Sequence, residues 1–144
     1  MPERIDALIT LIAVLNENDD VLLLKRKPDV HCPDVWSFPG GKIKASETPL
    51  DASIRELKEE TGLKGRLWRH IGKHQHTYQD RHLAFYFFFC RTAKNIKKDT
   101  TLHAESTYMW CPLSGLSKQT MPEANQALVT MLLDCYHEGL CPIP

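Results

Sequence analysis

The sequence predicts one α+β domain over residues 1–144, in which helices cover a mixed β-sheet as an α-β-α sandwich. Its length is that of one ordinary domain, and its 42% hydrophobic and 25% charged residues lie near globular averages. Segments with the apolar pattern of strands flank a segment with helical periodicity, and a second helical segment lies near the C-terminus. These observations together favour a sheet with helices packed on it.

The first elements are two predicted strands. Residues 5–14, IDALITLIAV, are apolar and rich in β-branched types. Residues 20–27, DVLLLKRK, follow after the polar segment NEND. This arrangement predicts an opening β-hairpin. A loop with Pro28, Pro33 and Trp36 then leads into SFPGGK.

A helix is expected to begin at Pro49 and to stop at Gly62. Thr48 can cap its N-terminus, Pro49 suits the first helical position, and Asp51 favours the positive end of the helix dipole. Gly62 is a typical residue for the C-terminal cap. The local signals for both ends of this helix are therefore strong.

Helical periodicity gives this segment an apolar and an acidic side. The stripe that we expect to face the core consists of Leu50, Ile54, Leu57 and Thr61. The roughly opposite stripe consists of Glu56, Glu59 and Glu60, with Ala52 among them.

The later elements are three strands and a final helix. Strands are expected over residues 66–78, 81–92 and 106–113. The second of them is apolar on both faces, so we expect it in the middle of the sheet. Residues 122–138 predict a helix, and its core-facing stripe is Ala124, Leu128, Met131, Leu132 and Cys135.

Composition excludes several classes of partner. Eighteen Lys and Arg balance eighteen Asp and Glu, so we expect no binding to a nucleic acid polymer and none to an anionic membrane. No segment is apolar for long enough to cross a bilayer, and the N-terminus does not read as a signal peptide. The five cysteines form no CxxC pair, which favours a reduced, cytoplasmic protein.

The acidic stripe suggests a metal site. Glu56, Glu59 and Glu60 repel one another unless a cation lies among them, and Mg²⁺ prefers such oxygen ligands. Arg55 lies four residues before Glu59 and can orient its carboxylate. For these residues alone, a solvated helix face is the competing interpretation.

The spacing around this stripe decides between the two interpretations. Nine positions fit the pattern G-x5-E-x7-R-E-U-x-E-E-x-G-U, where U is a bulky aliphatic residue: Gly41, Glu47, Arg55, Glu56, Leu57, Glu59, Glu60, Gly62 and Leu63. The sequence therefore resembles the Nudix hydrolases, which cleave nucleoside diphosphates linked to another moiety and use Mg²⁺ or Mn²⁺.

This resemblance implies the Nudix fold, with its loop-helix-loop motif, and roles for the matching residues. The implied metal ligands are Glu56, Glu59, Glu60 and the Gly40 carbonyl. Arg55, with Glu47, would hold the loop and the helix together.

In the chemistry so implied, metal ions neutralise the phosphate oxygens and a carboxylate accepts a proton from the attacking water. Two residues are candidates for this base, Glu59 on the helix and Glu105 in a later loop. The competing interpretation of Glu105 is an ordinary surface residue.

Four further stretches resemble the MutT-like branch of 8-oxo-dGTP diphosphatases, and the resemblance runs from about residue 5 to residue 132. They are LLKRKPDVH, FPGGKI running into SETP, QDRHLAFYFF and MPEANQALV. The resemblance assigns substrate-binding roles to Arg26, Phe38, Lys42, Asp80, Arg81 and Asn125.

Each of these residues has an individual role and a simpler alternative. Arg26 and Lys42 would contact phosphate or sugar, although Lys42 could be only solvated. Phe38 would line the base pocket, or belong to the core. Asp80 and Arg81 would edge that pocket, or form a turn-edge ion pair. Asn125 would contact the purine through its amide, which can both donate and accept, or serve as a first-turn polar residue.

The expected function is hydrolysis of 8-oxo-dGTP or a related nucleotide to the monophosphate and pyrophosphate, with a small-molecule nucleotide as the partner. One alternative is a Nudix hydrolase for CTP, dCTP or another nucleoside diphosphate derivative. The other is a module that binds a nucleotide without cleaving it. The sequence leaves open the phosphorus attacked, the number of metal ions and whether the protein is a monomer or a homodimer.

Overall fold

The structure is a computed structural model that describes residues 4–27, 35–79 and 81–142. Its strands are β1 (Ala7–Leu15), β2 (Asp20–Lys25), β3 (Trp36–Ser37), β4 (Gly40–Lys42), β5 (Arg66–Tyr78), β6 (Arg81–Arg91) and β7 (Tyr108–Pro112). Its helices are α1 (Pro49–Thr61), the short 3-10 helix η1 (Leu113–Lys118) and α2 (Glu123–His137).

Within these residues the strands form one mixed sheet in the order β3-β2-β1-β6-β5, with β4 paired to β1 and β7 paired to β2. Strands β1 and β6 run parallel and the other pairs are antiparallel. Strand β6 lies between β1 and β5, as its two apolar faces predict. The expected α+β class with a mixed sheet is confirmed.

The predicted hairpin is present but short. Strands β1 and β2 are antiparallel partners only around Leu15 and Val21. The earlier part of the same edge of β1 pairs instead with β4, where Leu11 lies opposite Gly40. Strands β2 and β4 therefore share one edge of β1. The two short strands β3 and β4 were not expected from the sequence.

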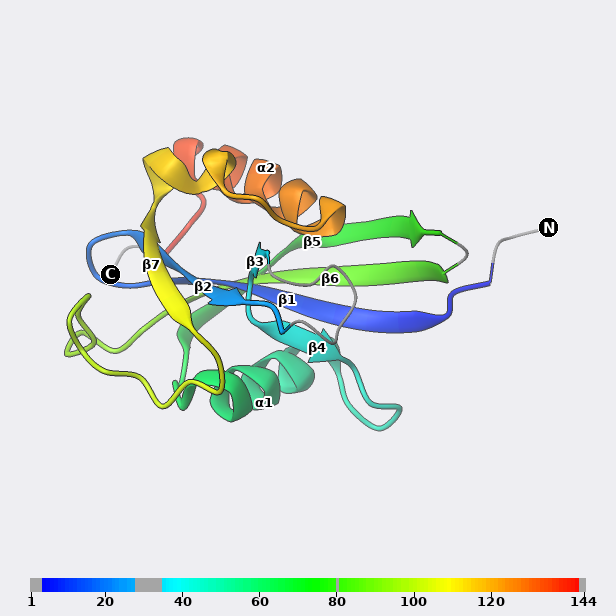
Figure 1. The fold of residues 1–144 in the computed structure, drawn as a ribbon, viewed down its shortest axis with the longest axis horizontal. Coiled ribbons are helices and arrows are strands. Elements are labelled where there is room, and N and C mark those ends of the chain that lie inside the picture. The colour runs from blue at the N-terminus through cyan, green and yellow to red at the C-terminus, as the bar shows by residue number, and fades with distance from the viewer. Residues whose placement is uncertain (1–3, 28–34, 80, 143–144) are drawn as a thin grey trace.

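The two helices cover opposite faces of the sheet, and each face has its own apolar cluster (Figure 1). On the α2 side the cluster includes Phe87, Leu128 and Leu132. On the α1 side it includes Ile12 and Leu57. Alternate residues of the same strands supply both clusters, because side chains of a strand point to opposite faces in turn.

Helix α1 begins and ends as predicted. The hydroxyl of Thr48 accepts a hydrogen bond from the backbone N–H of Asp51, at 3.1 Å. Gly62 ends the helix in the left-handed conformation, with φ of 76°, and its N–H donates to the carbonyl of Lys58. The caps therefore work through the residues that the sequence suggested.

The predicted buried stripe of α1 is partly wrong. Leu50 and Ile54 are exposed, at 38% and 41%, whereas Ala52 and Ser53 are buried together with Leu57. The helix lies on the sheet through polar contacts as well, since the hydroxyls of Ser53 and Thr10 are hydrogen-bonded at 2.5 Å. Relative to the prediction, α1 is thus rotated about its axis, and part of its acidic stripe faces the sheet edge.

The final helix α2 buries the expected Ala124, Leu128 and Leu132, with Met131 and Cys135 half-buried.

Candidate active site

Residues 38–41, which we call the glycine turn, lead from β3 into the start of β4 and approach their neighbours closely at two glycines. At Gly40 φ is +154°, and a Cβ there would lie 2.0 Å from the carbonyl oxygen of Thr10. At Gly41 a Cβ would lie 2.7 Å from the carboxylate carbon of Glu56. At Gly40 the close atoms belong to the backbone, so only glycine fits there, whereas a side chain at Gly41 would displace the carboxylate of Glu56. The side of α1 that carries Glu56 can therefore lie directly against this turn.

Arg55 joins helix α1 to the loop that precedes it. Its Nε and Nη2 donate to the two carboxylate oxygens of Glu47, at 2.6 and 2.8 Å, and Nη2 also donates to the backbone oxygen of Lys42 at 3.1 Å. Its Nη1 donates to Glu56 at 2.9 Å and to Glu59 at 3.2 Å. A two-point Arg–carboxylate pair fixes the geometry of both partners. These contacts are the ones that a positioning role for Arg55 and Glu47 requires.

Glu47 and Arg55 shift each other's pKa. The Arg55 guanidinium lowers the pKa of Glu47 from 4.5 to about 2, and the backbone N–H of Lys44, at 2.9 Å, contributes in the same direction. In return the hydrogen bond to Glu47 raises the pKa of Arg55. Glu47 is therefore ionised over the whole neutral range and remains a permanent partner of Arg55.

Glu56 and Glu60, next to this pair, have pKa values that are raised and not lowered. Burial raises the pKa of Glu60 to about 8, although the backbone N–H of Gly40 donates to its Oε1 at 2.8 Å and opposes this shift. The charges of Glu56 and Glu105 raise it further. Burial also raises the pKa of Glu56, against the effect of Arg55. Two desolvated carboxylates side by side are costly unless a cation accompanies them.

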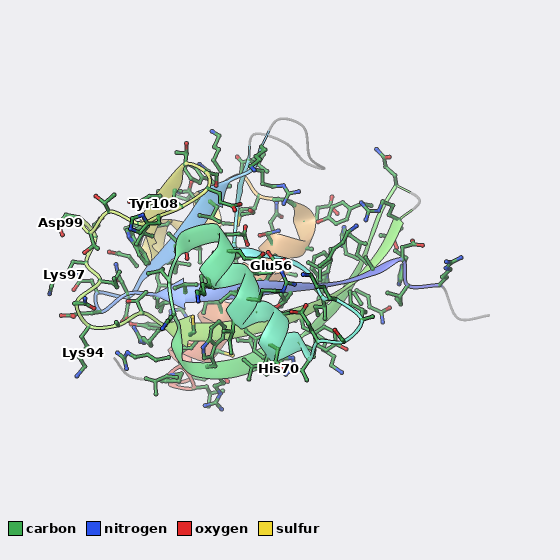
Figure 2. The ribbon with its side chains drawn as sticks, turned by 90° about the horizontal axis from the view of Figure 1, so that it is seen from below. Glu56, His70, Lys94, Lys97, Asp99 and Tyr108 are labelled. Carbon is green, nitrogen blue, oxygen red and sulfur yellow. The ribbon has the colours of Figure 1, made fainter. Side chains whose placement is uncertain are left out.

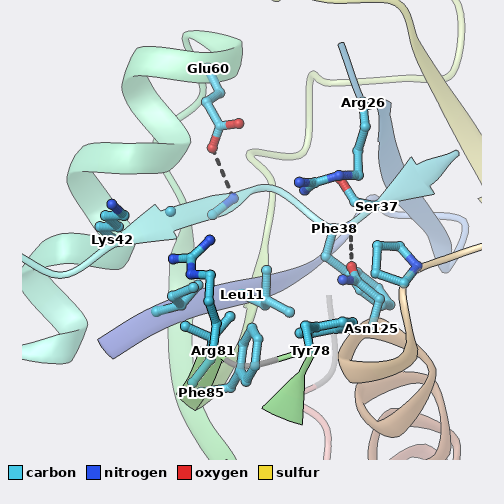
Figure 3. A pocket seen from close by; sticks show the side chains of 15 residues that line it. Leu11, Arg26, Ser37, Phe38, Lys42, Glu60, Tyr78, Arg81, Phe85 and Asn125 are labelled. Carbon is cyan, nitrogen blue, oxygen red and sulfur yellow. Dashed lines mark hydrogen bonds between the residues drawn. The ribbon is translucent and has the colours of Figure 1, made fainter. Parts of the chain in front are cut away.

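The donor set at this position fits a hard divalent cation. Glu56 and Glu60 offer carboxylate oxygens, which Mg²⁺ and Mn²⁺ prefer. Helix α1 carries both of them, Glu56 (Figure 2) and Glu60 (Figure 3), next to the glycine turn. Among the residues that the structure describes, no three His, Cys, Asp or Glu side chains stand close enough to form a complete metal site as they are placed. The side chain of Glu59 is 54% exposed and contacts Arg55. The ligand set of Glu56, Glu59, Glu60 and the Gly40 carbonyl therefore stays a prediction.

The loop between β6 and β7 brings Glu105 to the same end of the site. The backbone N–H of Glu105 donates to the carbonyl of Glu60 at 3.0 Å. Glu105, Glu60 and Arg26 line a cavity of about 240 Å³. Glu59, the other candidate base, is not among the residues that line it.

A larger cavity of about 300 Å³ adjoins the first, and Arg26, Ser37 and Glu60 line both. Five of the residues expected to bind substrate line it together: Arg26, Phe38, Lys42, Arg81 and Asn125 (Figure 3). The sixth, Asp80, lies outside the described residues. Segments far apart in the sequence thus converge on one space, and its volume is within the range of small-molecule sites.

Asn125 is held at the wall of this cavity. Its side chain is buried, at 4% exposure, and its Oδ1 accepts a hydrogen bond from the backbone N–H of Phe38 at 2.9 Å (Figure 3). Because a backbone N–H can only donate, this contact identifies the amide oxygen. The amide Nδ2 is then the group that Asn125 can offer to a ligand, and it offers hydrogen-bond donors. Phe38 combines both interpretations that its sequence position allowed, since it belongs to the core and lines the cavity.

Sequence reasoning did not identify several residues of the cavity. Its apolar wall consists of Ile9, Leu11, Leu83 and Phe85, on the paired strands β1 and β6. The two-residue period of these strands separates their two faces but does not say which face meets a ligand. Tyr78 and Pro122 also line the cavity. The only sequence signal for Tyr78 was its position next to the expected Asp80 and Arg81.

Comparison with known proteins was made by sequence and by structure. The NUDIX domain family model matches residues 7–132. An 8-oxo-dGTP diphosphatase of Escherichia coli K12 is 29% identical over 119 residues, which are 83% of this chain and 90% of that protein. A CTP pyrophosphohydrolase of the same organism is 25% identical over 105 residues, 72% of this chain and 76% of that protein.

Solved structures share the fold. The MutT protein from Methanosarcina mazei Go1 superposes with a TM-score of 0.75 at 20% identity, and the match covers 96% of this chain and 99% of that one. A MutT NUDIX hydrolase from Burkholderia pseudomallei gives a TM-score of 0.74 at 19% identity, covering 88% and 97% of the two chains. At these identities the likeness concerns the fold.

Within the described residues, no helix combines the length and apolar character needed to cross a membrane.

Proposed function

This chain belongs to the Nudix hydrolase family, and we propose that its substrate is an oxidised purine nucleoside triphosphate, 8-oxo-dGTP, which it cleaves to the monophosphate and pyrophosphate. The single observation that carries the proposal is Asn125, whose amide presents donors to the larger cavity, which Glu60 also lines. An amide NH₂ pairs with carbonyl acceptors, and guanine and 8-oxoguanine carry one at C6. Adenine carries an amino group there, so the same amide would disfavour it.

In this proposal the larger cavity binds the base of the nucleotide, and the phosphates lie near the carboxylates of α1. The base would lie against Phe38 and the apolar wall, and Asn125 would donate to its carbonyl. The phosphates would then extend past Arg26 and Lys42, which also line the cavity, toward Glu60. Cationic side chains along this path favour a polyphosphate over a neutral ligand. Contacts of Arg81 and Asp80 with the nucleotide at the edge of the base pocket remain predictions.

The residues of α1 would prepare the reacting phosphate. Glu56 and Glu60 would hold a divalent cation, which, when bound, neutralises phosphate oxygens and makes a water molecule more acidic. Arg55, fixed by Glu47, keeps Glu56 in place. Of the two candidate bases, Glu105 is favoured by position, because it lines a cavity with Glu60 whereas Glu59 faces Arg55. The proton of the attacking water would pass to this carboxylate.

A panel assay tests the substrate. Purified protein is incubated with Mg²⁺ and with 8-oxo-dGTP, dGTP, dATP, dCTP, CTP or ADP-ribose, and pyrophosphate and monophosphate are measured. We expect the highest kcat/KM for 8-oxo-dGTP. A clear preference for CTP or dCTP would support the proposed reaction but contradict the proposed nucleotide. The CTP pyrophosphohydrolase relative makes this the second candidate. A preference for ADP-ribose would contradict the proposal.

The same assay assigns the base. Glu105→Gln and Glu59→Gln are compared at saturating Mg²⁺ and substrate. If Glu105 is the base, its substitution lowers kcat about 10²- to 10⁴-fold, the usual effect of removing a general base. Glu59→Gln should then have the smaller effect. The reverse order would assign the proton transfer to Glu59. Location in the cytoplasm stays a prediction from the sequence.

A further inference from the structure

The first turn of helix α2 lacks a cap of its own. The residue at the N-cap position is Pro122, and no side chain at this position accepts a hydrogen bond from the turn. The first N–H groups of an α-helix have no partner inside the helix and need an acceptor elsewhere. A proline side chain cannot supply one, unlike the Ser, Thr, Asp and Asn that usually occupy the position. An acceptor from another part of the chain can take its place.

Tyr78 supplies this acceptor. Its hydroxyl accepts a hydrogen bond from the backbone N–H of Ala124, the second residue of α2, at 2.7 Å. Tyr78 is the last residue of β5 and is distant from Ala124 in sequence. The contact therefore joins the end of a strand to the start of a helix, and it does what an N-cap side chain normally does.

The same tyrosine lines the larger cavity, beside the residue that it helps to place. Asn125 directly follows Ala124, and both Tyr78 and Asn125 contribute to the cavity wall (Figure 3). The backbone of this turn is held by Tyr78, while the amide of Asn125 is held by the N–H of Phe38 at 2.9 Å. Two contacts, one from the end of β5 and one from the segment between β3 and β4, thus hold Asn125.

The ring of Tyr78 is itself positioned by its neighbours. The ring of His76, two residues earlier on the same face of β5, lies 4.5 Å from it between centroids. The Nε2 atom of His76 lies 2.6 Å from a carboxylate oxygen of Glu123, the first residue of α2. Consecutive same-face residues of β5 therefore contact consecutive residues of the helix start. This pairing limits rotation of the first turn relative to the cavity.

We propose that Tyr78 is a specificity-determining positioning residue, whose hydroxyl replaces the missing cap of α2 and thereby sets where the Asn125 amide meets the nucleobase. The inference rests on the proposed function for the identity of the base. Tyr78 acts through Asn125, so its effect falls on the choice and binding of the base. Glu56 and Glu60 belong to α1 and take their own contacts from Arg55 and Gly40, not from Tyr78.

The substitution Tyr78→Phe tests this role, because it removes the acceptor and keeps the ring. We expect the ratio of kcat/KM for 8-oxo-dGTP over dATP to fall about three- to tenfold, the range expected for one net hydrogen bond, because guanine-type bases offer the Asn125 amide a carbonyl at C6 and adenine does not. The change should appear in KM, with kcat at saturating 8-oxo-dGTP within about twofold of wild type. Hydrogen exchange of the Ala124 amide, followed by NMR, should become faster.

Two further variants separate positioning from general stability. Tyr136→Phe removes a hydroxyl from the other end of α2, where it donates to Asp19, and should lower thermal stability without changing selectivity. Pro122→Ser in the Tyr78→Phe background supplies a local N-cap. This rescue should slow the exchange of Ala124 and restore part of the selectivity.

Several outcomes would overturn the proposal. One is an unchanged selectivity ratio in Tyr78→Phe together with faster Ala124 exchange. Others are an equal loss for both nucleotides, or a loss confined to kcat. If 8-oxo-dGTP is not hydrolysed at all, the proposed function fails separately. Selectivity is then measured between the best nucleotide of the panel and its nearest analogue, while the exchange of Ala124 and its reversal by Pro122→Ser test the cap directly.

Discussion

The carboxylate end of the cleft and the base cavity are built in opposite ways. At the carboxylate end one continuous segment, residues 40–63, supplies the glycine turn, Glu47, Arg55 and the glutamates of α1, all joined by short contacts. The cavity collects side chains from β1, β3, β5, β6 and α2, and shares only Gly40, Gly41, Lys42 and Glu60 with that segment. The first is a local motif, and the second exists only after the sheet has formed.

This difference suggests how each region responds to change. Within the carboxylate segment, one arginine contacts three acidic side chains, so a single substitution disturbs the groups that would act on the phosphate. In the cavity, each contact is made by a separate element, so a substitution alters the fit of one side of the base. We therefore expect changes at the carboxylate end to lower the rate and changes in the cavity to alter selectivity.

The largest effect is expected for Glu60→Gln. The variant keeps an oxygen that can accept from the N–H of Gly40, so the turn should keep its shape, but it loses the charge next to Glu56. We expect kcat to fall about 10³-fold at saturating Mg²⁺, on the scale of removing a group that stabilises transition-state charge. Steady-state hydrolysis of the best nucleotide measures it.

Glu17→Gln is the matched control, because Glu17 pairs with Lys97 at the surface, away from both cavities. It should leave kcat unchanged. If Glu60→Gln kept more than about a tenth of wild-type kcat, the carboxylate end would not be the centre of the chemistry, and the contrast between the two regions would fail.

Sequence reasoning predicted the local region well because its signals are local. The caps of α1 depend on Thr48 and Gly62 themselves, and both act as expected. The buried face of α1 was predicted wrongly at Leu50 and Ile54, because apolar periodicity assumes that a helix packs through its apolar side. Here Ser53 meets Thr10, and the carboxylates face the glycine turn.

The cavity could be predicted only through its resemblance to known proteins. Arg26, Phe38, Lys42, Arg81 and Asn125 line it, yet no local pattern joins these positions. Tyr78 shows why the rest was missed. Its role depends on the missing cap at Pro122 and on a hydrogen bond across the fold, and neither can be read from the segment around it.

A smaller effect, of a different kind, is expected for Asn125→Asp. The aspartate can still accept from the N–H of Phe38, but it no longer offers a donor to the cavity. We expect kcat/KM for 8-oxo-dGTP to fall about 10- to 100-fold, as for the loss of a base-edge hydrogen bond. Its kcat should remain within a few-fold of wild type, and the nucleotide panel gives both constants.

Gln126→Glu is the control for the added charge, since Gln126 is the next residue of the same helix turn and is exposed outside the cavity. It should change the constants little. An equal loss in both variants would mean that charge near the start of α2, and not the amide of Asn125, sets selectivity. A loss of kcat larger than the change in KM would connect the cavity to the chemistry and remove the contrast.

The smallest expected effect is on stability, and it comes from the pair of Glu47 and Arg55 as the pH falls. In the folded protein the pKa of Glu47 is lowered from 4.5 to about 2, chiefly by its hydrogen bond to Arg55. The folded state therefore binds this proton less readily than the unfolded state. The contribution of Glu47 to stability is present above pH 4.5 and is lost as the pH falls from 4.5 toward 2.

Glu47→Gln lacks this pH-dependent contribution. Its melting temperature should lie below that of wild type by at most a few degrees near neutral pH, because the pair is partly exposed, and the difference should shrink as the pH falls below 4.5. Thermal unfolding at a series of pH values measures the difference, with Glu17→Gln as the exposed control. A difference that stayed constant down to the lowest pH would mean that Arg55 does not bind Glu47 as an ion pair. The loop and α1 would then be joined through Lys42 and the glycine turn instead, and the local region would depend less on charge than its contacts suggest.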